Sequence, residues 1–200
     1  GPFDVGTGLS AASAPDVAGT SDGFVVVMSA AGDVHAQRFG ADGTPRDAAA
    51  VAVSTAAGVQ DQPAVGATSG GDFLVTWRDE LLDGGDTGIG ARAFGADGTP
   101  RQEAFTLNTD TTGPQSQPSV AAGASRCLVA YVSRGQARAR SVSSMGDPLP
   151  NREAPPTTAD FEISSSAIEV AAAAGGSDTA PVVMTVTHDA DDIFARFLPL

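Results

Sequence analysis

The sequence predicts an all-β protein, and three observations indicate it. Hydrophobic stretches are short, rich in aromatic and β-branched residues, and separated by turns of Gly, Pro and Asp. The same unit recurs about every fifty residues. Each complete unit contains four such stretches. Four strands in a repeat of this length are typical of propeller blades, so the sequence predicts a four-bladed β-propeller with four antiparallel strands in each blade.

The clearest repeat runs from residue 62 to residue 109. Its predicted strands are 63–68, 72–77, 88–94 and 104–109. Between the third and the fourth lies GADGTPR, in which Asp-Gly followed by Pro predicts a hairpin turn. The octapeptide FGADGTPR occurs at 39–46 and again at 94–101, and ARSVSSMGDP at 139–148 is a weaker copy.

The predicted blades lie within a single domain of residues 1–200. They span residues 15–55, 63–109, 118–165 and 168–200. The last repeat ends before an outer strand, whereas the outer-strand pattern occurs at residues 3–7, FDVGT. We therefore expect the N-terminal strand to complete the last blade and to close the ring of a monomer. The alternative is a half-ring that dimerises.

The second strand of each repeat is apolar at successive positions, so both of its faces must be covered. These strands are 24–28, 73–77, 127–131 and 182–186. The single Trp77 and the single Tyr131 fall at equivalent places and are predicted core residues. Cys127, the only cysteine, takes the place of Phe24 and Phe73 and is predicted to be a small buried hydrophobe.

The first strands are expected to line the central channel. Two successive rings of equivalent positions hold only Ala and Gly: Ala18, Gly66, Ala121 and Ala171, then Gly19, Ala67, Ala122 and Ala172. Larger side chains would clash at so narrow an axis. Asp16 and Glu169 stand before these rings in blades that a closed ring makes adjacent, so they could hold a channel cation. The alternative is an empty or water-filled channel.

Two loops are predicted to form an acidic rim at one end of the propeller. The carboxylates of this acidic rim are Asp79, Glu80, Asp83, Asp86, Asp189, Asp191 and Asp192. Loops rich in oxygen ligands suit calcium or another hard cation, although neither loop has the spacing of an EF-hand. A solvated acidic surface is the alternative. The repeated turns place Arg46 and Arg101 on the opposite rim.

Charge and hydropathy exclude two classes of partner. Eleven basic residues against 24 acidic residues give a net charge of −13, which repels the phosphates of nucleic acids. No run of 18 apolar residues occurs, so we expect no membrane span.

The second repeat resembles the tandem units of bacterial secreted and cell-surface proteins. The resemblance is carried by QPAV at 62–65, DFLVTW at 72–77, GIGARAFGADGTP at 88–100 and FTLNT at 105–109. It implies an extracellular propeller module and brings no common catalytic residues. The blade count is similar to that of hemopexin-like domains, in architecture only.

Common catalytic motifs are lacking. His35 and His188 have no G-x-S-x-G partner, and two histidines with one cysteine cannot build a common zinc site. The sequence therefore predicts a protein that is not an enzyme: a non-catalytic extracellular module that binds a protein partner or a cell-surface component. Two alternatives stay open, a lectin-like propeller with a single asymmetric sugar site and an accessory domain of a secreted hydrolase.

Overall fold

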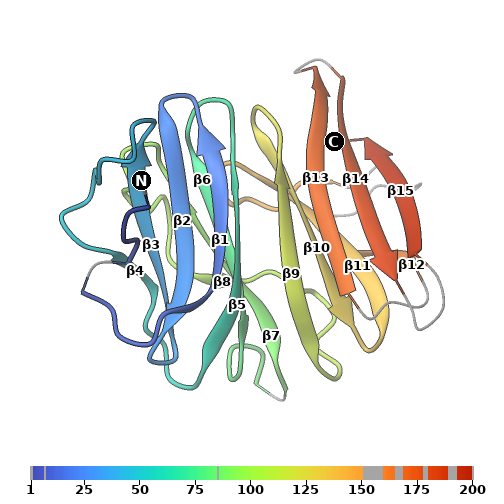
Figure 1. Ribbon diagram of the computed structural model, residues 1–200. Coiled ribbons are helices and arrows are strands. Elements are labelled where there is room, and N and C mark those ends of the chain that lie inside the picture. Colours follow the sequence, from blue (N-terminus) through green and yellow to red (C-terminus); the bar gives the residue numbers. More distant parts are fainter. Residues whose placement is uncertain are drawn as a thin grey trace.

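The computed structural model describes residues 2–6, 8–84, 86–150, 160–164, 169–177, 180–188 and 193–199, with side chains as far as Ile163. Every regular element in these ranges is a β-strand. None of the described segments is a helix able to cross a bilayer. The strands form antiparallel sheets that follow one another across the molecule in chain order (Figure 1). The prediction of an all-β protein is confirmed.

Each of the first three sheets contains four strands in sequence order, and the described part of the fourth contains three. The first is β1 (Ser13–Thr20), β2 (Gly23–Ala30), β3 (Asp33–Gly40) and β4 (Val51–Ser54). The second is β5 (Gln60–Ala67), β6 (Phe73–Asp79), β7 (Gly88–Phe94) and β8 (Phe105–Thr106). The third is β9 (Gln115–Ala122), β10 (Arg126–Ser133), β11 (Gln136–Ser143) and β12 (Phe161–Ser164). The fourth is β13 (Glu169–Ser177), β14 (Ala180–His188) and β15 (Ile193–Pro199). We call these sheets blades one to four.

The repeated Asp-Gly turns have the same geometry in the first two blades. The Gly40 amide donates to the Thr44 carbonyl at 2.8 Å, and the Gly95 amide donates to the Thr99 carbonyl at 2.9 Å. The turn glycine after each Asp has a positive φ, which glycine adopts without strain. The third blade keeps this turn, since Val142 and Pro148 form the same isolated bridge as Phe94 and Pro100. The weaker copy predicted at 139–148 is therefore confirmed.

Salt bridges confirm that these turns share one rim with the turns between first and second strands. Arg46 lies 2.7 Å from Asp22, and Arg101 lies 3.1 Å from Asp72. Both pairs are partly exposed to solvent, so each contributes little to stability. They show that the two kinds of turn lie on the same rim.

The second strands form the core, as their apolar sequence predicts. Trp77 and Tyr131 are fully buried. A Cβ on Gly90, which pairs with Trp77 across the sheet, would lie 2.4 Å from the indole ring. A small residue is therefore required on β7 because the largest side chain of the chain lies over it.

Cys127 is a buried core residue, as predicted. It pairs with Val142, whereas Phe73 pairs with Phe94 and Phe24 with Phe39 in the preceding blades. Desolvation raises the pKa of its thiol to about 12. A thiol of this pKa holds almost no thiolate at neutral pH and is a poor nucleophile.

Successive blades stack by placing a first strand on the second strand of the blade before. β5 lies against β2, β9 against β6, and β13 against β10. The inner strands of blades two and three approach closely, because a Cβ on Gly66 would lie 2.6 Å from Val120. The small residues expected along the axis are therefore required at this interface.

The described N-terminal residues contact blade one. Phe3 packs on blade one, with its ring centroid 5.5 Å from that of Phe39 and 6.3 Å from that of Phe24. The Gly6 amide donates to the side chain of Gln37 at 2.9 Å. Residues 2–6 form no strand in the structure. The completion of blade four by residues 3–7 stays a prediction.

The first and fourth blades lie at opposite ends of the row of sheets in Figure 1. Within the described strands, β1 adjoins β2 and β5, and β13 adjoins β14, β9 and β10. A closed ring of four blades and a single domain of residues 1–200 stay predictions.

Candidate functional site

Each of the first three inner strands carries a bulge before a proline. The residue before the proline has a positive φ in all three, 47° at Ala14, 49° at Gln62 and 55° at Gln117. The strand register shifts at the same three places. A left-handed backbone at a residue with a side chain is uncommon, and the following proline restricts it further. Bulges of this kind re-aim side chains next to binding sites.

The three bulges surround a depression of about 360 Å³ near the beginning of the inner strands, which we call the axial depression. Its lining residues are Ala14, Pro15, Asp16, Gln62, Pro63, Ala64, Gln117, Pro118 and Ser119. Small-molecule sites commonly have volumes of this order and a few polar groups among apolar ones. Here the prolines and alanines supply the apolar walls, and a carboxylate, two amides and a hydroxyl supply the polar groups.

Hydrogen bonds between blades hold the polar groups of the axial depression. One Asp16 carboxylate oxygen accepts from the Val17 amide and the other accepts from the Val65 amide of blade two, both at 2.9 Å. The Gln62 side-chain oxygen accepts from the Gln117 amide of blade three at 2.7 Å. These side chains are therefore positioned by the backbone of the next blade.

Glu169 does not occupy the register position expected for it. It pairs with His188, just as Gln60 pairs with Asp79 and Gln115 with Ser133. Asp16 instead pairs with Val27, farther along its hairpin. Glu169 therefore corresponds to the first residue of β5 and β9 rather than to Asp16. Blade four has no proline bulge in its inner strand, so counting along the sequence misaligns the strand.

The acidic rim is only partly exposed. Asp79 is 1% exposed, where it accepts a hydrogen bond from the Trp77 indole at 3.1 Å and one from the Leu81 amide at 3.0 Å. Its carboxylate therefore lies in the interior and not on the rim, because the indole needs a buried acceptor. Sequence reasoning placed it on the rim because it stands at the end of the strand.

The other described carboxylates of the acidic rim contact backbone and amide groups. Glu80 accepts from the Val59 amide at 3.0 Å. Asp83 accepts from the Asn108 side chain at 3.3 Å, and Asp86 accepts from the Thr87 amide at 2.9 Å. Asp189, Asp191 and Asp192 lie outside the described residues. Within the described part of the chain, no three His, Cys, Asp or Glu side chains gather as metal ligands do, and the cation sites stay predictions.

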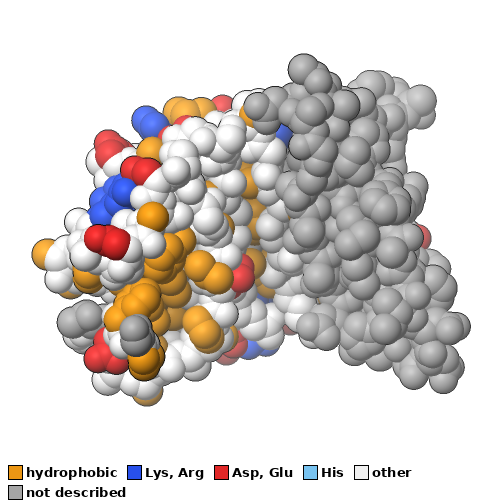
Figure 2. Space-filling view, turned by 45° about the horizontal axis from the view of Figure 1, so that its top comes forward, with side chains coloured by type: hydrophobic (Ala, Val, Ile, Leu, Met, Phe, Trp, Pro, Cys, Tyr) orange, Lys and Arg blue, Asp and Glu red, His pale blue; other side chains and the backbone are white. Residues whose placement is uncertain are grey.

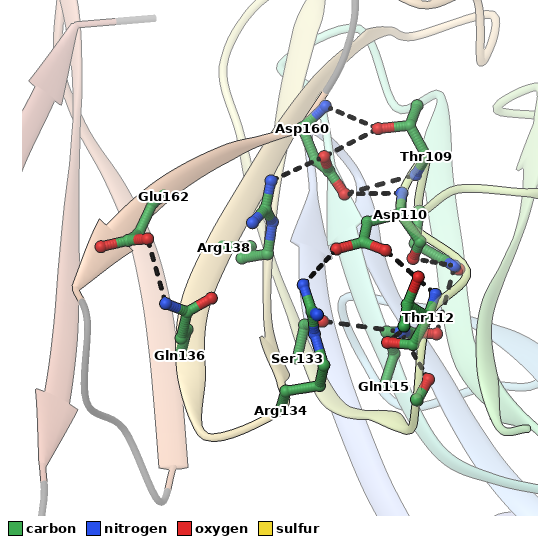
Figure 3. Close-up of polar contacts among 12 residues, drawn as sticks. Thr109, Asp110, Thr112, Gln115, Ser133, Arg134, Gln136, Arg138, Asp160 and Glu162 are labelled. Atoms are coloured by element: carbon green, nitrogen blue, oxygen red, sulfur yellow. Dashed lines mark hydrogen bonds and ion pairs between the residues drawn. The ribbon is translucent and has the colours of Figure 1, made fainter.

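A buried polar cluster joins blades two and three at the end of the molecule where the acidic rim lies (Figure 3). At its centre Asp160, whose side chain is 3% exposed, accepts from the Thr109 hydroxyl at 2.7 Å and forms an ion pair with Arg138 at 3.1 Å. The Tyr131 hydroxyl donates to the other carboxylate oxygen. Asp110 forms a further ion pair with Arg134.

The charges of this cluster stabilise one another. Burial alone would raise the pKa of Asp160, but hydrogen bonds from Tyr131 and Thr109 and the charge of Arg138 outweigh it, so the pKa is lowered. Burial and the Asp160 carboxylate raise the pKa of Tyr131. Both Asp160 oxygens are occupied by partners in the protein, so the cluster fastens two blades and leaves the axial depression as the better ligand site.

Two buried glutamines hold the loops that lead into the inner strands, and sequence reasoning did not single them out. The Gln60 amide donates to the carbonyls of residues 56, 57 and 58 at 3.2 to 3.3 Å. The Gln115 amide donates to the Gly113 carbonyl at 2.7 Å. The tetrapeptide Q-x-Q-P occurs at 60–63 and at 115–118 and could have found them. Its first glutamine fixes the loop, and its second lines the axial depression.

No family model and no curated protein sequence matches the chain. Solved structures do. An endo-arabinase from Bacteroides thetaiotaomicron VPI-5482 is 11% identical with a TM-score of 0.52, and the match covers 93% of this chain and 74% of that one. The fold is a β-propeller. The propeller prediction is thereby confirmed.

Two further structures share this propeller fold. A glycoside hydrolase family 43 arabinoxylan arabinofuranohydrolase from Bacillus subtilis, in complex with cellotetraose, matches with a TM-score of 0.56 and 11% identity over 90% of this chain and 43% of that one. A subtype N10 neuraminidase-like protein of A/little yellow-shouldered bat/Guatemala/060/2010 matches with a TM-score of 0.54 and 8% identity over 96% of this chain and 60% of that one. This propeller therefore spans less than two thirds of either protein.

These matches overturn the prediction of a non-catalytic scaffold that is not an enzyme. Two of the proteins that share this fold are named as glycoside-cleaving enzymes, and their matches cover 93% and 90% of this chain. That prediction was wrong because it took the lack of a histidine triad and of a common zinc site to exclude catalysis. Glycosidic bonds are commonly cleaved by two carboxyl groups, which need none of these.

Proposed function

We propose that this propeller is a carbohydrate-active domain of the glycoside hydrolase type and that it takes its saccharide at the axial depression. The observation that carries the proposal is the axial depression itself, a cavity of about 360 Å³ with Asp16, two glutamine side chains and Ser119 in its lining. Its fold is shared with an endo-arabinase and an arabinofuranohydrolase. Sugars are bound chiefly through hydroxyl groups, which amides and carboxylates recognise well.

Asp16 has the chemistry that glycosidic cleavage requires. A carboxyl group acts in this reaction as general acid, as general base or as nucleophile, and a second carboxyl group completes the pair. The two backbone amides that bind Asp16 hold it between blades one and two, so its position does not depend on a flexible loop. Asp16 is the one carboxylate among the described residues that line the axial depression, so we assign the reaction to it. Glu169, which begins the inner strand of blade four, lies at the other end of the row and is left out of the pair.

The substrates to test first follow from the printed names of the matching proteins. We infer a saccharide that contains arabinose, since both matching hydrolases are named for activity on such polymers. We also infer an extracellular location in a bacterium, because polymers of this size are met outside the cell and the repeats resemble those of secreted and surface proteins.

The test is hydrolysis by the purified chain of arabinan, arabinoxylan, cello-oligosaccharides and sialyllactose, measured as released reducing sugar or sialic acid. We expect release from an arabinose-containing substrate. Asp16→Asn should lower the rate by about 10²-fold to 10⁴-fold, the usual contribution of a general acid or base. Asp86→Asn, an exposed carboxylate on the acidic rim, is the matched control and should keep the wild-type rate.

Binding measured by calorimetry separates the possible failures. Saccharide binding without hydrolysis would reject a hydrolase and support the lectin-like alternative. Hydrolysis that survives Asp16→Asn would reject the assignment of the site. Neither binding nor release from any of these substrates would reject the function.

A further inference from the structure

One face of blade one is exposed where the equivalent faces of blades two and three are buried. Val17, Val65 and Val120 occupy the same register position, opposite Val26, Val75 and Val129 respectively. Val65 is 4% exposed and Val120 is 9% exposed, whereas Val17 is 59% exposed. The residue type is the same in all three blades, so the difference lies in what covers the strand.

The strand that covers Val65 and Val120 is the second strand of the preceding blade. β2 lies against β5, and β6 lies against β9. In the described part of the chain, no second strand lies in the same way against β1. Gly19 lies two residues beyond Val17 on the same face of β1, and a Cβ there would meet no heavy atom within 4 Å. Three blade interfaces in this chain place a first strand on a second strand. The face of β1 is the first-strand half of such an interface, without its second strand.

The opposite end of the row carries the other half. β14 is the second strand of blade four, and its sequence is rich in apolar residues, as are those of β2, β6 and β10. No described first strand follows it in the row of sheets. Blade one and blade four lie at opposite ends of the molecule in Figure 1, so β14 of the same chain does not cover β1.

Further apolar side chains are exposed around this face. Phe3 is 52% exposed and Val5 is 39% exposed in the segment that packs on blade one. Figure 2 shows hydrophobic side chains gathered on the surface over the first blade. Contiguous exposed apolar surface of this kind marks a site of protein interaction.

We propose that the face of β1 binds β14 of a second copy of this chain, in a head-to-tail dimer. The partner strand is assigned by continuity, because each blade interface within the chain places a first strand on a preceding second strand. The two surfaces differ, so the contact is heterologous. The dimer is closed because each copy supplies the face of β1 to one contact and β14 to the other. The dimer then contains two such interfaces and leaves neither exposed.

The oligomeric state of the intact chain tests this directly. Sedimentation equilibrium and light scattering should give a mass twice the 19.9 kDa of one chain, and dilution should release monomers. Val17→Asp places a charge at the centre of the contact and should raise the dissociation constant by about a hundredfold or more. Leu81→Asp is the matched control, because Leu81 is 58% exposed on the acidic rim, and it should leave the dimer intact.

Circular dichroism and thermal unfolding of both variants keep the test sharp, since Val17→Asp changes an exposed residue and should fold as the wild type does. A wild-type chain that is monomeric at every concentration would overturn the proposal. So would a dimer that Val17→Asp does not weaken, or open assemblies larger than a dimer. None of these outcomes bears on saccharide hydrolysis, so this proposal and the proposed function fail separately.

Discussion

At the scale of single residues, buried polar side chains decide how this propeller is held together. The Trp77 indole finds its acceptor in Asp79, and the Tyr131 hydroxyl finds its acceptor in Asp160. Each pair satisfies a donor that would otherwise be buried without a partner, at a cost of about 1–3 kcal/mol. The second and third blades thus solve the same problem with different residues, and the third adds the cation of Arg138.

The lowered pKa of Asp160 makes a prediction about pH. Its carboxyl group has an ordinary pKa of 3.8 and a lower one in the folded state, so in acid the unfolded chain binds the proton more readily. The stability that Asp160 contributes is therefore complete above about pH 5 and is lost as the pH falls through the folded pKa. Urea unfolding at a series of pH values should show stability that falls with pH below about 4, and Asp160→Asn should flatten that dependence.

At neutral pH, Asp160→Asn should also lower the free energy of unfolding by about 1–3 kcal/mol, because it removes the charge that pairs with half-buried Arg138. Asp86→Asn is exposed and should leave stability at neutral pH unchanged. An Asp160→Asn variant with the wild-type dependence on pH would contradict the assigned role of the cluster.

At the scale of elements, the loops that enter the inner strands are fixed from within. Gln115 is fully buried, donates to the Gly113 carbonyl and accepts from Asn108, so it connects the loop before β9 to the segment after β8 (Figure 3). Gln60 serves the loop before β5. Such anchors set where β5 and β9 begin and therefore where the axial depression lies.

We expect Gln115→Ala to lower the free energy of unfolding by about 1–3 kcal/mol, since it removes the bonds of a fully buried amide to the Gly113 carbonyl and from the Asn108 side chain. Hydrogen exchange should rise in residues 110–114 more than in β10. Gln136→Ala, which loses only a solvent-exposed bond to Glu162, is the control and should change stability by less than about 0.5 kcal/mol. Equal effects of the two substitutions would show that the buried amide does not anchor the loop.

At the scale of the whole molecule, the chain is a row of blades whose ends differ. The interfaces between successive blades are apolar and close, and the first blade is covered in part by residues 2–6 instead of by another blade. Residues 2–6 thus lie on part of the blade-one surface that a neighbouring blade would otherwise contact. Stability of blade one should depend on them.

Phe3→Ala tests this dependence. Phe3 is about half exposed and packs on Phe24 and Phe39, so its truncation should lower the free energy of unfolding by about 1 kcal/mol. Val51→Ala changes a residue of similar exposure on β4 and should cost less, because fewer methyl groups are removed. Urea unfolding of both variants measures the difference. A Phe3→Ala variant as stable as the wild type would contradict packing of this segment on blade one.

Several features of the fold could be predicted because they are local. Strand alternation, the Asp-Gly turns and a repeat of about fifty residues depend on neighbouring residues, and so does the apolar character of the second strands. Trp77, Tyr131 and Cys127 could be assigned to the core for the same reason. The Q-x-Q-P motif is local too, and its meaning was missed because the bond from its first glutamine to a loop is not visible in a sequence.

Local sequence patterns are enough to predict a repeated all-β chain with buried second strands. Contacts in the folded chain were needed to show where Phe3 packs, that Asp79 is buried beside an indole, and that Glu169 lies in register with Gln60 and Gln115. They were also needed to show that Asp16 and the bulged glutamines meet around one depression. The physical reason is that each of these positions depends on contacts between distant blades, and a periodic pattern specifies the blades without specifying how their ends are covered.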